Sequence, residues 1–283
     1  KINPNTESLE GEASVKDFET LLQLVYLGFT AVREDAEAYQ TFEAQMANYL
    51  AHRDANPKAA FYDSVAMMST NYSPRTVLRN KEMLRQVSME QCVAVYKERF
   101  YNPADFTFFI VGNINPEDKA FQKAVCTYLG SLKGKGQKET FADNGVRVPQ
   151  GKVKNYFSRE MQTTTASNRI QYTSYQMPYT LANSLNMEMI GRVLSTRYLE
   201  SIREREGGSY GVGTHGYMQQ WPVDKATLLM QFDTDPLKQE RLMEIIYGEI
   251  DTILAEGPLS SDVEKEKASM LKDYTENLEK NEW

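Results

Sequence analysis

Two side chains in this sequence, an arginine and a tyrosine at close spacing, are of types that can take part in binding or catalysis. They lie in residues 203–213, REREGGSYGVG, where Gly207 and Gly208 follow the last charges of an amphipathic helical pattern. Glycine adopts the left-handed conformation without a Cβ clash, so the pattern predicts a helix C-terminus that turns into a strand. The turn would hold Arg203 near Tyr210, and these two hydrogen-bond donors could bind a peptide carbonyl or stabilise an oxyanion. The residues alone leave open a plain helix-turn-strand joint in which neither side chain has a role.

The two histidines do not form a metal-binding motif. His52 is expected at the end of a helix, and His215 on a strand facing solvent, although a position lining a cleft stays open for His215. The sequence has no HExxH or HxxEH, the patterns that place two imidazoles on one helix face to hold zinc. It also has no GxSxG, Walker loop or GxGxxG. These residues therefore assemble no complete catalytic site.

The composition limits the class of protein. The chain has 283 residues, long enough for two domains, and its net charge of −7 excludes a basic nucleic-acid-binding surface. No apolar run reaches the length of a membrane span. The chain begins at Lys1 and ends inside a charged helical pattern, so we expect a piece of a longer protein, from which a signal peptide could have been removed. Cys92 and Cys126 lie on apolar faces of predicted helices without CxxC spacing, so we expect buried free thiols, with a disulfide or a ligand pair as the alternative.

Helical periodicity dominates the first part of the chain. Ser14 is expected to begin a helix, Ser88 and Gln91 to form a capping box, and Asn115 with Pro116 to start a further helix.

One segment of this first part predicts a strand. Residues 105–112, DFTFFIVG, are almost all apolar and β-prone, which is typical of a central strand covered by helices.

Residues 133–151 are rich in lysine and glycine and predict a linker. We therefore expect domains at residues 1–132 and 152–283.

The sequence of the second domain predicts several strands and one long helix between them. That helix starts after Pro178 at Thr180 and runs through Ile202. Asp235 followed by proline is expected to cap a later helix, and Ser261 to cap the last one. The expected strands are residues 152–160, 163–176, 210–218 and 226–232.

The two halves of the chain show a weak internal repeat. Residues 14–46 and 235–270 share the order of capped helix, short break and second helix. The sequence thus predicts an α+β fold of two similar domains, each a mostly antiparallel sheet with helices on one face. The first domain would lack its opening strands, and the second its C-terminal end.

Three segments resemble one family. Residues 198–210, YLESIREREGGSY, resemble the Arg-to-Tyr signature in the C-terminal half of the pitrilysin/insulysin family of inverted-zincin metallopeptidases. Residues 11–17, GEASVKD, match a G-x-x-S-x-x-D stretch that precedes a helix of the third family domain. Residues 108–113, FFIVGN, resemble the family's closing VGN strand. The resemblance covers nearly the whole chain.

The resemblance implies roles for two residues. Full members have two halves, each of two similar α+β domains, that close as a clamshell around a chamber. The N-terminal half holds zinc through HxxEH and a distal glutamate, and the C-terminal half supplies an Arg and a Tyr. Carried over, Arg203 would bind a substrate carbonyl with its planar fork of donors, and Tyr210 would donate to the scissile carbonyl oxygen. Arg205 has the wrong spacing to Tyr210.

We therefore expect the C-terminal, substrate-binding half of a zinc metalloendopeptidase that hydrolyses peptides. The resemblance implies that residues 1–132 are its third family-type domain and residues 152–283 its fourth. Without HxxEH it would be inactive alone, and the zinc of the parent protein would belong to the N-terminal half, on the same chain or on a partner subunit. The alternative within the family is a non-catalytic peptide-binding or assembly subunit. A third possibility is an unrelated ferredoxin-like α+β binding protein. The abundance of tyrosine and asparagine favours a periplasmic or otherwise exported protein, without nucleic-acid or membrane-spanning partners.

Overall fold

The computed structural model describes residues 1–206 and 211–280, with no side chains described for residues 203–206. The chain divides into two compact units. Unit 1 consists of Lys1–Arg53 and Arg79–Ala142, and unit 2 of Asp54–Leu78 and Asp143–Trp283. Unit 2 resumes at Asp143, inside the predicted linker, and also includes a helical segment from the first part of the chain. The assignment of residues 1–132 and 152–283 to the third and fourth family domains stays a prediction.

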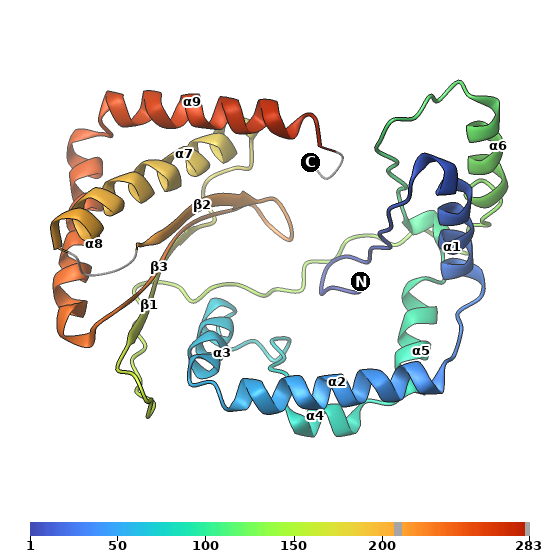
Figure 1. Cartoon of the computed structure of the whole chain (residues 1–283), viewed down its shortest axis with the longest axis horizontal. Helices are drawn as coiled ribbons and strands as arrows, with labels where there is room; N and C mark the ends of the chain where they lie inside the picture. Colours follow the sequence, from blue (N-terminus) through green and yellow to red (C-terminus); the bar gives the residue numbers. More distant parts are fainter. Residues whose placement is uncertain (207–210, 281–283) are drawn as a thin grey trace. The chain divides into compact units, whose positions relative to one another are not determined.

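Unit 1 is built from helices (Figure 1). The predicted capping box is confirmed, since the Gln91 amide donates to Ser88 Oγ at 3.2 Å and the Ser88 amide donates to Gln91 Oε1 at 3.0 Å. Its aromatic core joins Phe29, Phe100 and Phe106, with ring centroids 4.9 Å apart for Phe29 and Phe106. The elements are η1 (Val15–Asp17), α1 (Phe18–Thr30), α2 (Ala36–Asp54), α4 (Lys81–Gln86), α5 (Met89–Arg99), η2 (Pro103–Asp105) and α6 (Lys119–Tyr128).

The strand predicted over residues 105–112 is wrong. The segment leaves η2 and forms no strand in the part of the chain that the structure describes. Phe109 and Val111 are 85% and 66% exposed. A strand needs a neighbour to pair with, and the described part of unit 1 offers only an isolated bridge between Ile2 and Glu7. An apolar, β-prone sequence therefore stays unpaired here, with Phe106 packed in the aromatic core and Phe109 exposed.

Two further expectations for unit 1 are corrected. Cys92 and Cys126 are free, as expected, but they are exposed and not buried. Asn115 does not start α6, because Asp118 caps it instead. The Asp118 carboxylate accepts from the amides of Ala120 at 2.7 Å and Phe121 at 3.1 Å.

Unit 2 contains a three-stranded antiparallel sheet in the order β1-β3-β2. The strands are β1 (Ala166–Ser174), β2 (Gly213–Gln219) and β3 (Lys225–Thr234), close to three of the predicted ranges. The strand predicted over residues 152–160 is wrong, since this segment runs extended without pairing. In the register of the sheet, Ile170 lies opposite Met230 and Gly213 lies opposite Gln231.

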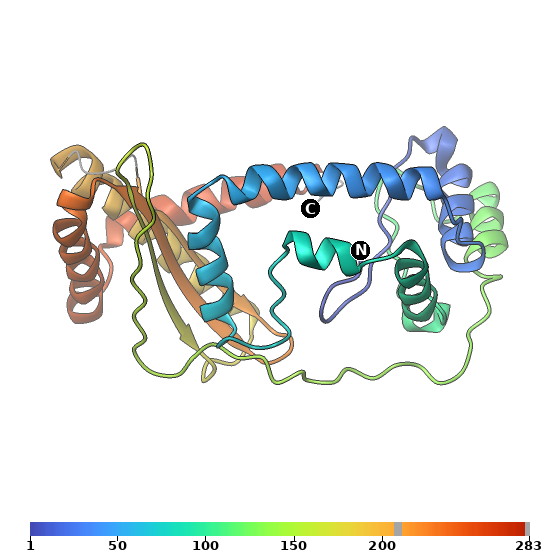
Figure 2. The same cartoon turned by 90° about the horizontal axis from the view of Figure 1, so that it is seen from below.

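Helices α7 and α8 cover one face of this sheet. The fully buried core joins Tyr198, Ile202, Met230 and Ile246, each 0% exposed. Helix α9 runs alongside α7, and α3 lies on the side of the sheet away from α8 (Figures 1 and 2). The helices of this unit are α3 (Lys58–Ser69), α7 (Leu181–Tyr198), η3 (Leu199–Glu206), η4 (Pro236–Lys238), α8 (Gln239–Glu256) and α9 (Ser260–Asn277).

In unit 2, hydrogen bonds from nearby backbone amides to capping side chains mark where helices begin. Thr180 caps α7 as predicted, because its Oγ1 accepts from the Asn183 amide at 3.0 Å. Asp235 caps the next turn by accepting from the Leu237 amide at 2.9 Å. The N-cap of α9 is Leu259, two residues before the expected cap Ser261. The α+β class is confirmed, and no helix among the described residues is long and apolar enough to cross a membrane.

Candidate functional site

The two candidate residues lie where α7 meets β2. Arg203 falls in η3, a π-helix of eight residues that continues α7. Tyr210 lies outside the described residues, one position before Gly211, where the described chain resumes and enters β2. The structure thus brings the helix end and the strand start into one joint. The approach of the Arg203 and Tyr210 side chains stays a prediction.

Buried anchors hold the helix up to this joint. Tyr198 and Ile202 are 0% exposed, and the Tyr198 hydroxyl donates to the Ile246 carbonyl of α8 at 3.2 Å. Burial raises the pKa of Tyr198, so its phenol stays protonated and keeps this bond. The last residues before Arg203 are therefore fixed to the core.

The joint begins where regular helical bonding ends. A π-helix bonds i to i+5, is rare, and occurs frequently at functional sites. Here the Ser201 hydroxyl donates to the Arg197 carbonyl at 2.8 Å, at the point where the bonding pattern changes. The π-helix gives the candidate Arg203 a backbone setting that an ordinary helix end would not provide.

The Arg197 side chain, just before the π-helix, links three helices by hydrogen bonds. Its Nε donates to Glu249 of α8 at 2.6 Å, and its Nη1 to Asp262 of α9 at 3.4 Å. The three side chains are only 17–19% exposed. The hydrogen bond that Arg197 donates to Glu249 raises the pKa of Arg197, so the guanidinium remains charged. We call these three residues the Arg197 clasp.

Two glycines bring α7 against β2 at backbone distance. A Cβ on Gly216 would lie 1.8 Å from the Met187 carbonyl oxygen, and one on Gly191 would lie 2.4 Å from the Gly216 nitrogen. Only glycine permits this approach. The helix that leads into the joint and the strand that leaves it are therefore held in direct contact.

A shallow hollow opens beside the joint. Its volume is about 240 Å³, and it is lined by Ser195, Thr196 and Leu199 from the helix and by Gly211, Val212 and Gly213 from the chain entering β2. No titratable side chain is among these lining residues. The hollow can receive a small side chain or a stretch of peptide backbone, but its lining offers no general acid or base.

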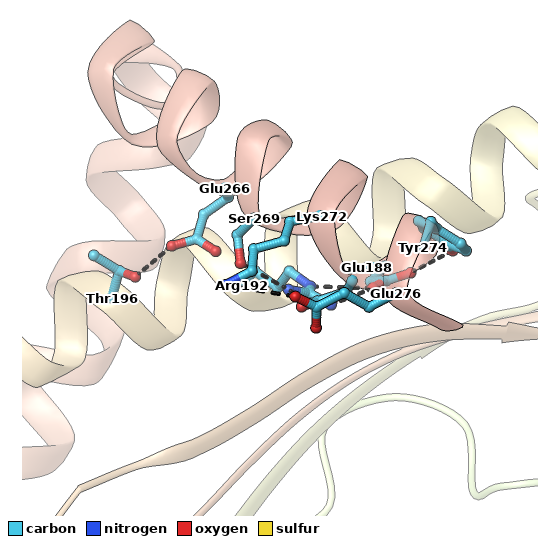
Figure 3. A network of polar contacts seen from close by, with 9 residues as sticks. Glu188, Arg192, Thr196, Glu266, Ser269, Lys272, Tyr274 and Glu276 are labelled. Carbon is cyan, nitrogen blue, oxygen red and sulfur yellow. Dashed lines mark hydrogen bonds and ion pairs between the residues drawn. The ribbon is translucent and has the colours of Figure 1, made fainter. Parts of the chain in front are cut away.

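A second set of polar contacts fixes α9 on α7 (Figure 3). Arg192 donates to Glu188 on its own helix at 3.0 Å and to Asp273 of α9 at 2.8 Å. The Tyr274 hydroxyl donates to Glu188 at 3.2 Å. Each of these groups is paired, which indicates a structural role.

The described residues do not fit a zinc site. No three His, Cys, Asp or Glu side chains among them are grouped as metal ligands. His52 lies exposed on α2 in unit 1, with Nδ1 2.8 Å from the Asn48 carbonyl, and His215 lies exposed on β2 in unit 2.

The sequence did not single out Arg197, Gly191 or Gly216, because their partners are distant in the chain and no local pattern marks them.

Three comparisons with known proteins agree with this fold. Residues 91–270, which include α7, η3 and the sheet, match the family described as Peptidase M16 inactive domain. The "Probable zinc protease PqqL" of Escherichia coli strain K12 is 25% identical over 192 residues, covering 68% of this chain and 20% of the relative. The "Zinc protease PQQL-like" of Arabidopsis thaliana is 24% identical over 267 residues, covering 87% of this chain and 27% of the relative.

The fold is also shared with a solved structure. The crystal structure of the periplasmic protease PqqL from Escherichia coli superposes with a TM-score of 0.79 at 17% identity, covering 94% of this chain and 29% of that one. The chain therefore spans less than a third of the length of each of these three relatives.

Proposed function

The chain belongs to the peptidase M16 family, as its inactive domain, and we propose that it is the C-terminal, substrate-binding half of a zinc metalloendopeptidase. The relatives named zinc proteases support this proposal, as does the match over the residues that carry the joint. The peptide substrate would be held in a chamber closed by the two halves of the parent protein.

The joint between α7 and β2 is the observation that carries this proposal. The core, the Arg197 clasp and the glycine contact all fix the chain immediately before and after the candidate residues. A site must be held rigidly to bind a reacting group in one geometry. The hollow beside it has the size and lining to receive part of an extended peptide.

In the proposal Arg203 and Tyr210 act on the substrate backbone. Arg203 binds a peptide carbonyl through its planar donors, which orients the chain of the substrate. Tyr210 donates to the scissile carbonyl oxygen, on which negative charge grows during hydrolysis. A donor aimed at that oxygen lowers the barrier because its bond is stronger in the transition state than in the ground state.

The zinc and the partner are assigned to the other half. The described residues offer no ligand set, so zinc would be bound by the N-terminal half, on the same chain or on a partner subunit. A relative is described as periplasmic, which supports an exported location for the parent protein.

Peptide hydrolysis by the whole parent protein tests the proposal. Tyr210→Phe removes one hydroxyl and is expected to lower kcat about 10²-fold, the usual cost of losing one oxyanion donor. Arg203→Lys keeps the charge but loses the fork of donors, so KM is expected to rise.

A matched tyrosine gives the control. Tyr247→Phe makes the same change on an exposed residue of α8 and should leave kcat and KM unchanged. Unchanged activity in Tyr210→Phe would remove the oxyanion role from this half. No chelator-sensitive hydrolysis by the wild-type parent would favour the alternative, a non-catalytic peptide-binding or assembly subunit.

A further inference from the structure

The sheet of unit 2 has a second face, opposite the one that α7 and α8 cover, and α3 lies against this face at β1 (Figure 2). Successive side chains along a strand alternate between the two faces. Met230 on β3 lies in the core, so Gln231 and Thr227 lie on the other side. The register places Arg169 opposite Gln231 and Tyr217 opposite Thr227. We call this the polar face; its polar residues include Arg169, Gln171, Tyr217, Lys225, Thr227 and Gln231, and Leu229 lies among them on β3.

The polar face holds unsatisfied hydrogen-bonding atoms. Buried polar atoms in proteins almost always have a partner, and each exception calls for an explanation. Among the described side chains, Arg169 Nε and Thr227 Oγ1 are buried without a partner, and both lie on this face. Thr227 is 1% exposed. Arg169 uses another nitrogen, Nη2, to donate to Gln171 at 3.1 Å, while its Nε has no partner among the described residues.

The same face holds two cations without a carboxylate. Neither Arg169 nor Lys225 forms an ion pair with any side chain in the described part of the chain. Burial lowers the pKa of both groups, and the nearby Arg147 contributes at Lys225. At one end of the face Lys58 of α3 donates to Asp233 at 2.6 Å, so this lysine is neutralised. Two partly buried cations without an ion pair among the described residues indicate a place for an outside anion.

The spacing of the two cations fits an extended peptide. Arg169 lies opposite Gln231, six positions from Lys225 along β3. A strand rises about 3.3 Å per residue, so the cations are about 20 Å apart along the sheet. Side chains six residues apart in an extended peptide point the same way. Gln231 lies level with Arg169, and its amide can bond to a peptide group beside that cation.

We infer that the polar face binds an acidic, extended segment of a polypeptide, with one carboxylate at Arg169 and a second at Lys225. Calling that polypeptide the substrate rests on the proposed function, but binding itself does not. Nucleic acid fits less well, because a phosphate backbone needs a dense field of cations. An acidic peptide needs only the two that the face provides.

Binding of a labelled peptide to the whole protein that contains this chain tests the inference. The probe is a fluorescent 12-residue peptide with glutamate at positions 3 and 9, and its control has glutamine at both. The glutamate peptide should bind more tightly, with the advantage shrinking at high salt. Arg169→Gln or Lys225→Gln should each weaken its binding about tenfold, the effect of losing one charge-assisted hydrogen bond.

Matched variants separate binding from folding. Lys267→Gln removes an exposed lysine of α9 and should leave binding unchanged, and Arg169→Lys should retain part of it. Thermal unfolding of each variant checks that the fold is intact. Equal affinity for the two peptides, or full binding by folded Arg169→Gln, would overturn the inference.

Hydrolysis of a neutral peptide keeps the two proposals apart. Chelator-sensitive hydrolysis of a neutral peptide, together with equal binding of the two labelled peptides, would reject the polar face and keep the proposed function. Tight binding of the glutamate peptide without chelator-sensitive hydrolysis of any peptide would do the reverse.

Discussion

At the scale of single residues, the contact between Gly216 and α7 leaves the least room for a larger side chain. Gly216→Ala would place a Cβ 1.8 Å from the Met187 carbonyl oxygen, so the helix must move away from β2. We expect a loss of about 3 kcal/mol or more in the free energy of unfolding, at the upper end of the cost of overpacking. Urea denaturation followed by circular dichroism measures it.

Gly248 of α8 provides the matched control. A Cβ there would meet nothing within 4 Å. Gly248→Ala should therefore stabilise the protein by about 0.5–1 kcal/mol, the gain of alanine over glycine inside a helix. Equal effects of the two substitutions would contradict the close approach of α7 and β2.

Asp143 is expected to make stability depend on pH. Its hydrogen bonds with Arg147, and with the Gly145 amide, hold its pKa at about 2. The unfolded value is about 3.9, so the folded state binds this proton less readily. The pairing therefore stabilises fully above about pH 4, and its contribution is lost as the pH falls towards 2.

A carboxyl-carbon NMR titration of Asp143 measures this directly. The expected midpoint is near pH 2, and Arg147→Gln should move it up towards about 4. A midpoint near 4 in the wild-type protein would show that the pair does not form in solution.

At the scale of elements, the Arg197 clasp determines how α7, α8 and α9 meet. Arg197→Ala would leave Glu249 and Asp262 poorly exposed and without their cation. We expect a loss of about 2–3 kcal/mol, the range for a hydrogen-bonded charge removed from a partly buried site. If the clasp also positions the joint, kcat of the parent protein should fall in variants that remain folded.

Lys272→Ala is the control for that experiment. Its ion pair with Glu276 on α9 spans 3.7 Å, and the two side chains are 72% and 59% exposed. Exposed pairs contribute at most about 1 kcal/mol. If Lys272→Ala lowered the free energy of unfolding as much as Arg197→Ala, the Arg197 clasp would contribute no more than an exposed ion pair.

The elements also show what sequence patterns can and cannot predict. The capping box of Ser88 and the caps at Thr180 and Asp235 depend on neighbours within a few residues, so they were predictable. Residues 105–112 have a strand-like composition, but pairing depends on a neighbouring strand that composition does not reveal. For the candidate site, the sequence predicted a helix that turns into a strand. It did not predict the π-helix or the clasp, because Arg197 meets partners 52 and 65 positions away.

At the scale of the whole molecule, the two units differ in how much they bury. In unit 1 the buried hydrophobic residues are Leu22, Leu50 and Phe100, whereas unit 2 contains the large cluster around Met230. Because burial is the main source of stability, unit 1 should open at a lower free energy than unit 2.

Hydrogen exchange of the 283-residue chain, followed by mass spectrometry, tests this difference. Amides of the helices of unit 1 should exchange well before those of β3 and α7. Similar protection in both units would contradict the expectation and would show that they unfold together.

The π-helix Leu199–Glu206 gives the chain a place where its length can change. An α-helix bonds i to i+4 and a π-helix i to i+5, so the loss of one residue can be absorbed by exchanging one pattern for the other. Such a deletion would leave the buried anchor Tyr198 in place. The later positions of the helix would keep their direction, because the exchange removes only the extra residue of the wider turn. A single-residue deletion after Ile202 would therefore shorten the path into the joint while Tyr198 and Ile202 stay in the core.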